Sequence, residues 1–501
     1  MESIKPARVR FAPSPTGRMH MGSARTALYN YLLAKRTGGQ FILRIEDTDY
    51  KRFVKGAEEE LMLGLRWLGL QWDEGVGMGG PYGPYRQSER KEIYLEYAQK
   101  LVDSGHAYAC FCSKEHLDVI RQEQMKNKEN LHYDGTCRNL SKDESNSRIA
   151  KGEPHVIRFK TPREGSITAH DALRGDIIVE NKNIDDYVLV KSDGWALYHL
   201  AAMVDDHLME ITHVIRGSEW LSTFPLHVHI LQAFGWEEPV WVHLSVFLKP
   251  SGKGKMSKRD ASDALESGYS IFVTDLEKLG YTPEGVLNWI LLMGWGIAEG
   301  EFMTLPEMVL KFDIDKVNPS PAAIDFTKLD YFSGAHIRNL SNDVLASRIK
   351  PFFEKEGYLI DDDKLIQIVP IIRERLVTLD DAVFFAGFFF RNNIEPILND
   401  LVGKNLTVLE SRNVLQRSFT ILSSLDELTP VLAEPPMRLL VEEMGLKPGQ
   451  VFGILRAAVT GQSVSPPLFE SMEIIGKEIV LERIRKALKI LSNSIDLKNR
   501  A

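Results

Sequence analysis

The segment from His20 to Ser23 has the residue types of a phosphate-binding turn. It joins a short apolar run to a stretch with helical periodicity. Backbone N–H groups at the beginning of a helix attract anions, and a glycine such as Gly22 lets a flat ligand approach the backbone. His20 can donate a further hydrogen bond to a phosphate. A plain loop, in which the serine caps a helix and the histidine is incidental, is the alternative.

Residues 253–259 (KGKMSKR) form a second candidate segment, with four cations in seven residues. Gly252 and Gly254 suit a mobile loop that closes over a polyphosphate. Lys255 and Lys258 would then stabilise the charge that builds up as pyrophosphate leaves. A solvated basic loop is the alternative.

The three cysteines of the chain, Cys110, Cys112 and Cys137, can supply three ligands to a zinc ion. Three buried or free thiols are the alternative. So few cysteines exclude a disulfide framework and are typical of a protein in a reducing cytosol.

The elements around the first turn predict a parallel sheet. Strands are expected at residues 8–12 and 41–45, and helices at 23–35 and 58–68, from the apolar periodicity and the breaker residues. Alternating strands and helices indicate a doubly wound α/β fold.

Two later regions differ from this pattern. Residues 105–200 contain all three cysteines and several strand-like segments, and they are expected to form an inserted α/β subdomain. From residue 275 onward, leucine, isoleucine and phenylalanine recur at helical spacing, which predicts an all-helical C-terminal region.

Length and composition limit the class of protein. The chain has 501 residues, enough for several domains. Its formal net charge of −8 excludes a generally basic nucleic-acid coat but allows a local basic face. The first residues contain no apolar signal segment, and no apolar stretch approaches the ~20 residues of a membrane-spanning helix. A soluble, multidomain, cytosolic protein is expected.

The two phosphate-binding segments together are the signatures of the class I aminoacyl-tRNA synthetases, which the chain resembles. Within this class it resembles the bacterial glutamyl-tRNA synthetase family. The motifs that carry this resemblance are RFAPSPTG at 10–17, RIEDTD at 44–49, GPYRQSER at 83–90, KMSKR at 255–259 and LRAAVTG at 455–461.

The resemblance implies a class I Rossmann-type catalytic domain, an inserted α/β subdomain and an all-helical anticodon-binding region. The implied ranges are 1–90 and 202–247 for the catalytic domain, 91–201 for the acceptor-stem insertion with a possible zinc site, 248–336 for a mobile-loop and stem-contact domain, and 337–501 for an anticodon-binding domain of two helical subdomains.

The implied activity is the ATP-dependent attachment of L-glutamate to tRNA-Glu through a glutamyl-adenylate. The substrates would be glutamate, tRNA-Glu and ATP with Mg²⁺. No membrane partner is implied, and the family suggests a cytoplasmic monomer with one structural Zn²⁺ ion.

The resemblance also assigns roles to matching positions. Arg10 and Arg216 would meet the carboxylates of glutamate, because an arginine fork can grip a carboxylate with two hydrogen bonds. Glu46 would hold the ammonium group. The full implied glutamate site is Arg10, Ala12, Ser14, Glu46, Tyr198, Ala202 and Arg216, although the family often has asparagine where this chain has Ala202. The implied catalytic and ATP-binding residues are His20, Gly22, Glu219, Lys255 and Lys258.

Two further sets of residues follow from the resemblance. Arg375 matches an arginine set against the third anticodon base in members selective for tRNA-Glu, and Arg456 is a weaker anticodon candidate. Zinc-bearing relatives often have a histidine where this chain has Asn139. Tyr133 is therefore the best fourth zinc ligand, with His132 and His116 as rivals.

Four alternatives remain at this point. In the first, the enzyme charges tRNA-Gln with glutamate as well as tRNA-Glu. In the second, the chain is a glutaminyl-tRNA synthetase, which is disfavoured because that enzyme usually has a β-barrel anticodon domain rather than a helical one. A truncated tRNA-modifying paralogue is disfavoured by the length of the chain. A tRNA-binding module without catalysis is disfavoured because His20, Gly22, Lys255 and Lys258 are all present.

Overall fold

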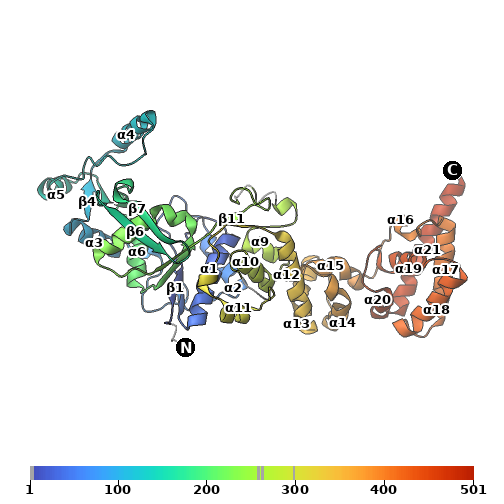
Figure 1. The fold of residues 1–501 in the computed structure, drawn as a ribbon. Coiled ribbons are helices and arrows are strands. Elements are labelled where there is room, and N and C mark those ends of the chain that lie inside the picture. The colour runs from blue at the N-terminus through green and yellow to red at the C-terminus, as the bar shows by residue number, and fades with distance from the viewer. Residues whose placement is uncertain (1–4, 257–259, 261–263, 297–299, 501) are drawn as a thin grey trace. The chain divides into compact units, whose positions relative to one another are not determined.

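The computed structural model describes residues 5–256, 260, 264–296 and 300–500. The chain divides into two compact units (Figure 1). The first comprises Met1–Glu277 and Val286–Phe326, and the second comprises Lys278–Gly285 and Thr327–Ala501. The first unit contains sheets and helices, whereas the second is helical.

A seven-stranded sheet forms the centre of the first unit, in the order β3-β2-β1-β9-β10-β6-β7. All neighbouring strands are parallel except β6 and β7. The strands are β1 (Arg8–Phe11), β2 (Gln40–Leu43), β3 (Glu74–Gly75), β6 (Ser166–Asp171), β7 (Gly175–Glu180), β9 (His213–Gly217) and β10 (Val240–Leu244).

The predicted strand–helix–strand–helix unit at the beginning of the chain is confirmed. It consists of β1, α1 (Met21–Thr37), β2 and α2 (Ala57–Trp67). Leu28, Leu32 and Leu33 of α1 are buried. The helix ends at Gly38, which adopts the left-handed conformation with φ 68° that glycine accommodates without strain.

The remaining helices of the first unit cover the sheet or lie in its connections. They are α3 (Lys91–Asp103), α4 (Lys114–Asn127), α5 (Lys142–Ala150), α6 (Tyr198–Leu208), α7 (Phe224–Phe234), α9 (Val273–Lys278), α10 (Pro283–Leu292) and α11 (Leu305–Lys311). The short strands β11 (Phe247–Leu248) and β12 (Ala322–Ala323) pair in parallel, so much of the predicted domain at 248–336 lies in this unit.

The predicted insertion over 91–201 shares the main sheet rather than standing apart from it. Strands β6 and β7 lie within this range, and β6 pairs with β10. Only β4 (Ala107–Cys110), β5 (Val156–Phe159) and β8 (Val188–Val190) form a separate, antiparallel sheet. Residue patterns show that a strand is half-buried, but they do not show which sheet it joins.

The second unit contains α12 (Phe326–Asn339), α13 (Asn342–Lys355), α14 (Asp362–Ile372), α15 (Asp381–Ala386), α16 (Leu398–Leu401), α17 (Val408–Ser424), α18 (Pro430–Glu443), α19 (Pro448–Thr460), α20 (Leu468–Ile475) and α21 (Lys477–Arg500). This confirms the predicted helical region. Its buried residues, from Ile337 to Leu491, form one cluster, so the two expected subdomains share a core. Over the described residues, no helix is long and apolar enough to cross a membrane.

Candidate active site

A cleft of about 690 Å³ lies beyond the carboxyl ends of β1 and β9, where open parallel sheets bind ligands. It brings together most of the residues predicted for glutamate and ATP. Those that line it are Arg10, Ala12, Ser14, His20, Gly22, Glu46, Tyr198, Arg216, Glu219 and Lys255. Lys258, the remaining predicted phosphate contact, lies outside the residues that the structure describes.

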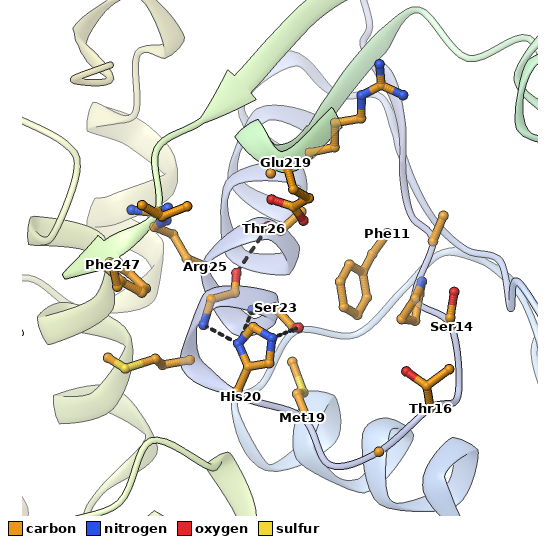
Figure 2. A pocket seen from close by; sticks show the side chains of 18 of the residues that line it. Phe11, Ser14, Thr16, Met19, His20, Ser23, Arg25, Thr26, Glu219 and Phe247 are labelled. Carbon is orange, nitrogen blue, oxygen red and sulfur yellow. Dashed lines mark hydrogen bonds between the residues drawn. The ribbon is translucent and has the colours of Figure 1, made fainter. Parts of the chain in front are cut away.

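His20 is the N-cap of α1, and its ring lies against the first turn of the helix (Figure 2). Its Nδ1 accepts hydrogen bonds from the backbone N–H groups of Gly22 (3.0 Å) and Ser23 (3.3 Å). A neutral imidazole that accepts at Nδ1 carries its proton on Nε2. This Nε2 lies 3.3 Å from the Ser23 hydroxyl oxygen, so a phosphate oxygen would share or replace that contact while the ring caps the helix.

Gly22 is required by this cap. A Cβ at position 22 would lie 2.9 Å from Cε1 of His20, too close for the ring to remain where it is. The glycine therefore serves the histidine as well as a ligand that approaches the backbone.

Arg216 is buried, and neutral groups surround its guanidinium. Its Nε donates to Nε2 of His243 (2.9 Å), Nη1 to the Tyr198 hydroxyl (3.1 Å) and Nη2 to Nδ1 of His227 (2.9 Å). It forms no ion pair with a carboxylate among the described residues. Two of its five N–H donors remain for a ligand. Trp220 stacks on Tyr198 at 3.8 Å and holds that ring in place.

Arg10, unlike Arg216, is already paired with a carboxylate of the protein. Its Nε donates to Asp206 (3.0 Å) and its Nη1 to the carbonyl of Ile215 (3.3 Å). The same Asp206 accepts a hydrogen bond from Arg44 (2.8 Å). Its Nη2 also donates to Asp206 (3.4 Å), so Arg10 lines the cleft but part of its role is structural.

Glu46 faces the cleft from the end of β2 and accepts a hydrogen bond from Arg44 (3.2 Å). Burial raises the pKa of Glu46 to about 7, although the charges of Arg44 and Arg10 favour the carboxylate. A buried carboxyl group of this kind is stabilised in its charged form by a cation in the cleft.

The contact of Ala202 with glutamate stays a prediction. Its side chain is fully buried and does not line the cleft. It lies one turn after Tyr198 on the same side of α6, and its methyl group ends within the core.

Sequence reasoning missed several residues that hold the site together. They are Arg25, Arg44, Asp206, Trp220, His227 and His243. All but Trp220 are buried. Arg25 lies 4.0 Å from the centre of the Phe247 ring at the cleft wall (Figure 2). A buried polar residue gives a signal in the sequence only when its partner is known, and most of these partners are distant along the chain.

The three thiols converge around one hydroxyl group. The Sγ atoms lie within 4.8 Å of one another, and those of Cys112 and Cys137 are 3.6 Å apart. The Tyr133 hydroxyl lies 3.3 Å from Cys110 and 3.5 Å from Cys112. Ligands around a tetrahedral zinc ion are separated by about 3.5 to 3.8 Å, so the three thiols are compatible with a zinc site, with the Tyr133 hydroxyl close enough to be a fourth ligand.

The rival histidines do not join this group. No histidine or carboxylate of the described chain belongs to it. His116 is exposed, with its Nε2 3.5 Å from Thr136, and His132 is exposed, with its Nδ1 2.8 Å from the carbonyl of Asn130.

The two anticodon candidates lie near each other in the second unit. Arg375 is exposed, with its guanidinium 5.9 Å from the centre of the Phe385 ring. Burial lowers the pKa of Arg456, and the charge of Arg375 lowers it further. Nη1 of Arg456 donates to the carbonyls of Ser465 and Pro466, so this residue stabilises the loop after α19.

Comparisons with known proteins agree with this arrangement. Residues 6–331 match the family of class I tRNA synthetases (E and Q), catalytic domain, and residues 344–488 match an anticodon binding domain. The chain is 44% identical to a glutamate–tRNA ligase of Borrelia duttonii over 97% of its length and 96% of the relative's. It is 42% identical to one of Dehalococcoides mccartyi, with 97% and 98% covered.

A solved structure agrees as well. The crystal structure of a glutamate tRNA ligase from Elizabethkingia meningosepticum, in complex with its amino acid, superposes with a TM-score of 0.88 at 37% identity. The match covers 97% of this chain and all of the other. The chain therefore belongs to the class I tRNA synthetases for glutamate and glutamine and, within them, to the glutamate–tRNA ligases.

Proposed function

We propose that the chain activates L-glutamate with ATP and transfers it to tRNA-Glu. The observation that carries the substrate assignment is Arg216, a buried guanidinium that faces the cleft without a carboxylate partner among the described residues. A buried cation of this kind is stabilised by a ligand carboxylate. Glu46 supplies the complementary charge for the ammonium group of the ligand.

The reaction needs positioning and charge stabilisation rather than a protein nucleophile. A carboxylate oxygen of glutamate attacks the α-phosphorus of ATP, a P–O bond forms, and pyrophosphate leaves. The 2′-hydroxyl of the terminal adenosine then attacks the acyl carbon, and AMP leaves. Bound Mg²⁺ would neutralise phosphate charge. His20 and Lys255, which both line the cleft, would contact the phosphates.

The experiment that tests this function is aminoacylation with labelled glutamate or labelled glutamine, each on purified tRNA-Glu and tRNA-Gln. Glutamate on tRNA-Glu alone is expected. Glutamate on both tRNAs would indicate the enzyme with relaxed tRNA choice, and glutamine on tRNA-Gln would overturn the amino-acid assignment.

We also propose that Cys110, Cys112, Cys137 and Tyr133 hold one structural zinc ion. The protein purified without chelators is expected to contain one zinc per chain. Cys112→Ser should lose the metal, and Tyr133→Phe should weaken zinc binding by at least about tenfold in a competition with a chelator, because one of four ligands is gone. His116→Ala is the matched control and should retain zinc. A metal-free wild-type protein would contradict the proposal.

Arg375 is the proposed reader of the anticodon. Anticodon bases are recognised by stacking and by hydrogen bonds to their edges, and one good arginine–base contact discriminates by about 1–3 kcal/mol. Arg375→Gln is therefore expected to reduce the preference for tRNA-Glu over tRNA-Gln by about tenfold, measured as the ratio of the two kcat/KM values. The exposed Arg438→Gln on α18 is the control. An unchanged ratio would mean that Arg375 does not read the anticodon.

A further inference from the structure

A chain of hydrogen bonds runs through Arg216 and connects four polar side chains from four different elements, β6, β10, α7 and α6. Asp171 accepts from Nδ1 of His243 (2.7 Å), and Nε2 of His243 accepts from Arg216 (2.9 Å). On the other side, Nδ1 of His227 accepts from Arg216 (2.9 Å), and Nε2 of His227 lies 2.9 Å from Nδ1 of His199. Asp171, His243 and His227 are completely buried.

These contacts fix the protonation of each ring. A carboxylate only accepts and a guanidinium only donates, so His243 must carry its proton on Nδ1 and leave Nε2 as an acceptor. His227 must likewise accept at Nδ1 and therefore donates from Nε2 to His199. Burial lowers the pKa of His243 and of His199 to about 4, and it lowers that of His227 as well. All three rings are neutral at neutral pH.

The register of the main sheet creates this juxtaposition. His243 on β10 lies directly opposite Arg216 on β9. Asp171 is the last residue of β6, the other neighbour of β10, where it also accepts the backbone N–H of His243 (3.0 Å). β6, which lies within the residues expected to form the insertion, therefore supplies the carboxylate at the end of this hydrogen-bond chain.

The intervening ring separates two functions of the carboxylate. If Asp171 touched Arg216 directly, it would neutralise the guanidinium. Through His243 it fixes the orientation of the guanidinium and keeps its own negative charge one side chain away. Arg216 thus remains a buried and oriented cation without a direct carboxylate partner among the described residues, and such a group favours a ligand with a negative charge over a neutral one.

We propose that Asp171 and His243 are positioning residues for amino-acid specificity. They hold Arg216 so that the cleft accepts the side-chain carboxylate of glutamate and rejects the neutral side-chain amide of glutamine. The inference rests on the proposed function for the identity of the ligand, but the protonation of the histidine rings does not depend on that function.

The test compares two substitutions of His243. His243→Phe retains a ring but removes the acceptor, whereas the side-chain carbonyl of His243→Gln can occupy the place of Nε2. The phenylalanine variant is expected to raise KM for glutamate by about 10- to 50-fold, with KM for ATP unchanged, because a charged donor loses its buried partner. His243→Gln should retain most of the wild-type affinity for glutamate.

A matched control lies on the same hairpin. His170 and Asp176 form a similar pair, with Nδ1 2.7 Å from the carboxylate, but both are exposed. His170→Phe should leave both KM values unchanged. If His243→Phe raised KM for glutamate and for ATP equally, or if His243→Gln did not restore the affinity for glutamate, then His243 would act only by packing.

A second measurement does not depend on activity. Histidine ring ¹⁵N NMR of the wild-type protein at neutral pH should show His243 protonated at Nδ1 and unprotonated at Nε2. A proton on Nε2 would overturn the inference even if glutamate is charged. If the rings are as expected but wild-type protein charges no glutamate, the proposed function fails instead.

Discussion

Arg216→Met should lower kcat/KM for glutamate by about 1,000-fold. The substitution removes the cation opposite a substrate carboxylate, and loss of one partner of a buried ion pair costs about 3–5 kcal/mol. It also leaves His243, His227 and Tyr198 without their shared donor. The variant should discriminate little between glutamate and glutamine. Aminoacylation of tRNA-Glu with each amino acid measures both effects.

Arg148→Met is the matched control for this substitution. Arg148 is a charged residue of α5 that pairs with Glu153 and does not line the cleft. Its kcat/KM values should equal those of the wild-type protein. If the Arg216 variant loses activity equally for ATP and glutamate, or retains its preference for glutamate, then another group recognises the carboxylate.

The first part of the fold could be predicted because its signals are local. Apolar periodicity, the breaker residues near Pro13 and the stop at Gly38 are all visible within the first 40 residues, and β1 and α1 follow them closely. The helical second unit was visible for the same reason, since helical spacing repeats within a few residues. No local signal tells that β6 lies beside β10, because sheet order depends on contacts between distant segments.

The candidate site divides in the same way. His20 and Gly22 stand in a recognisable turn, and their relation is local, since the ring caps its own helix. Asp206 and His243 were not predicted, because each acts on an arginine that is distant in sequence or on a neighbouring strand. Residues that touch a ligand stand in recognisable sequence motifs. The residues that orient them cannot be told from ordinary core residues until the register of the strands is known.

Glutamate binding should weaken as the pH falls below 7, by about tenfold between pH 8 and pH 6. Burial raises the pKa of Glu46 to about 7 in the free protein. The ammonium group of bound glutamate favours the carboxylate form, so binding releases a proton from Glu46, and a lower pH opposes that release. The ligand itself retains its charges over this range. Calorimetric titration of glutamate at several pH values, in buffers of different ionisation enthalpy, measures both affinity and proton release.

Glu46→Gln identifies the group that titrates. This variant should bind glutamate about 30- to 100-fold more weakly at pH 8, because the ammonium group loses a charged hydrogen-bond acceptor, and its affinity should be nearly independent of pH from 6 to 8. The charged groups around Glu46 are Arg44, Arg10 and Asp206. Burial opposes the charged form of Asp206, but the charges of Arg10 and Arg44 hold its pKa below the ordinary value, so Asp206 does not titrate in this range. A pH slope that survives in the variant would therefore assign the titration to a group beyond this cluster and would leave Glu46 as a structural partner of Arg44.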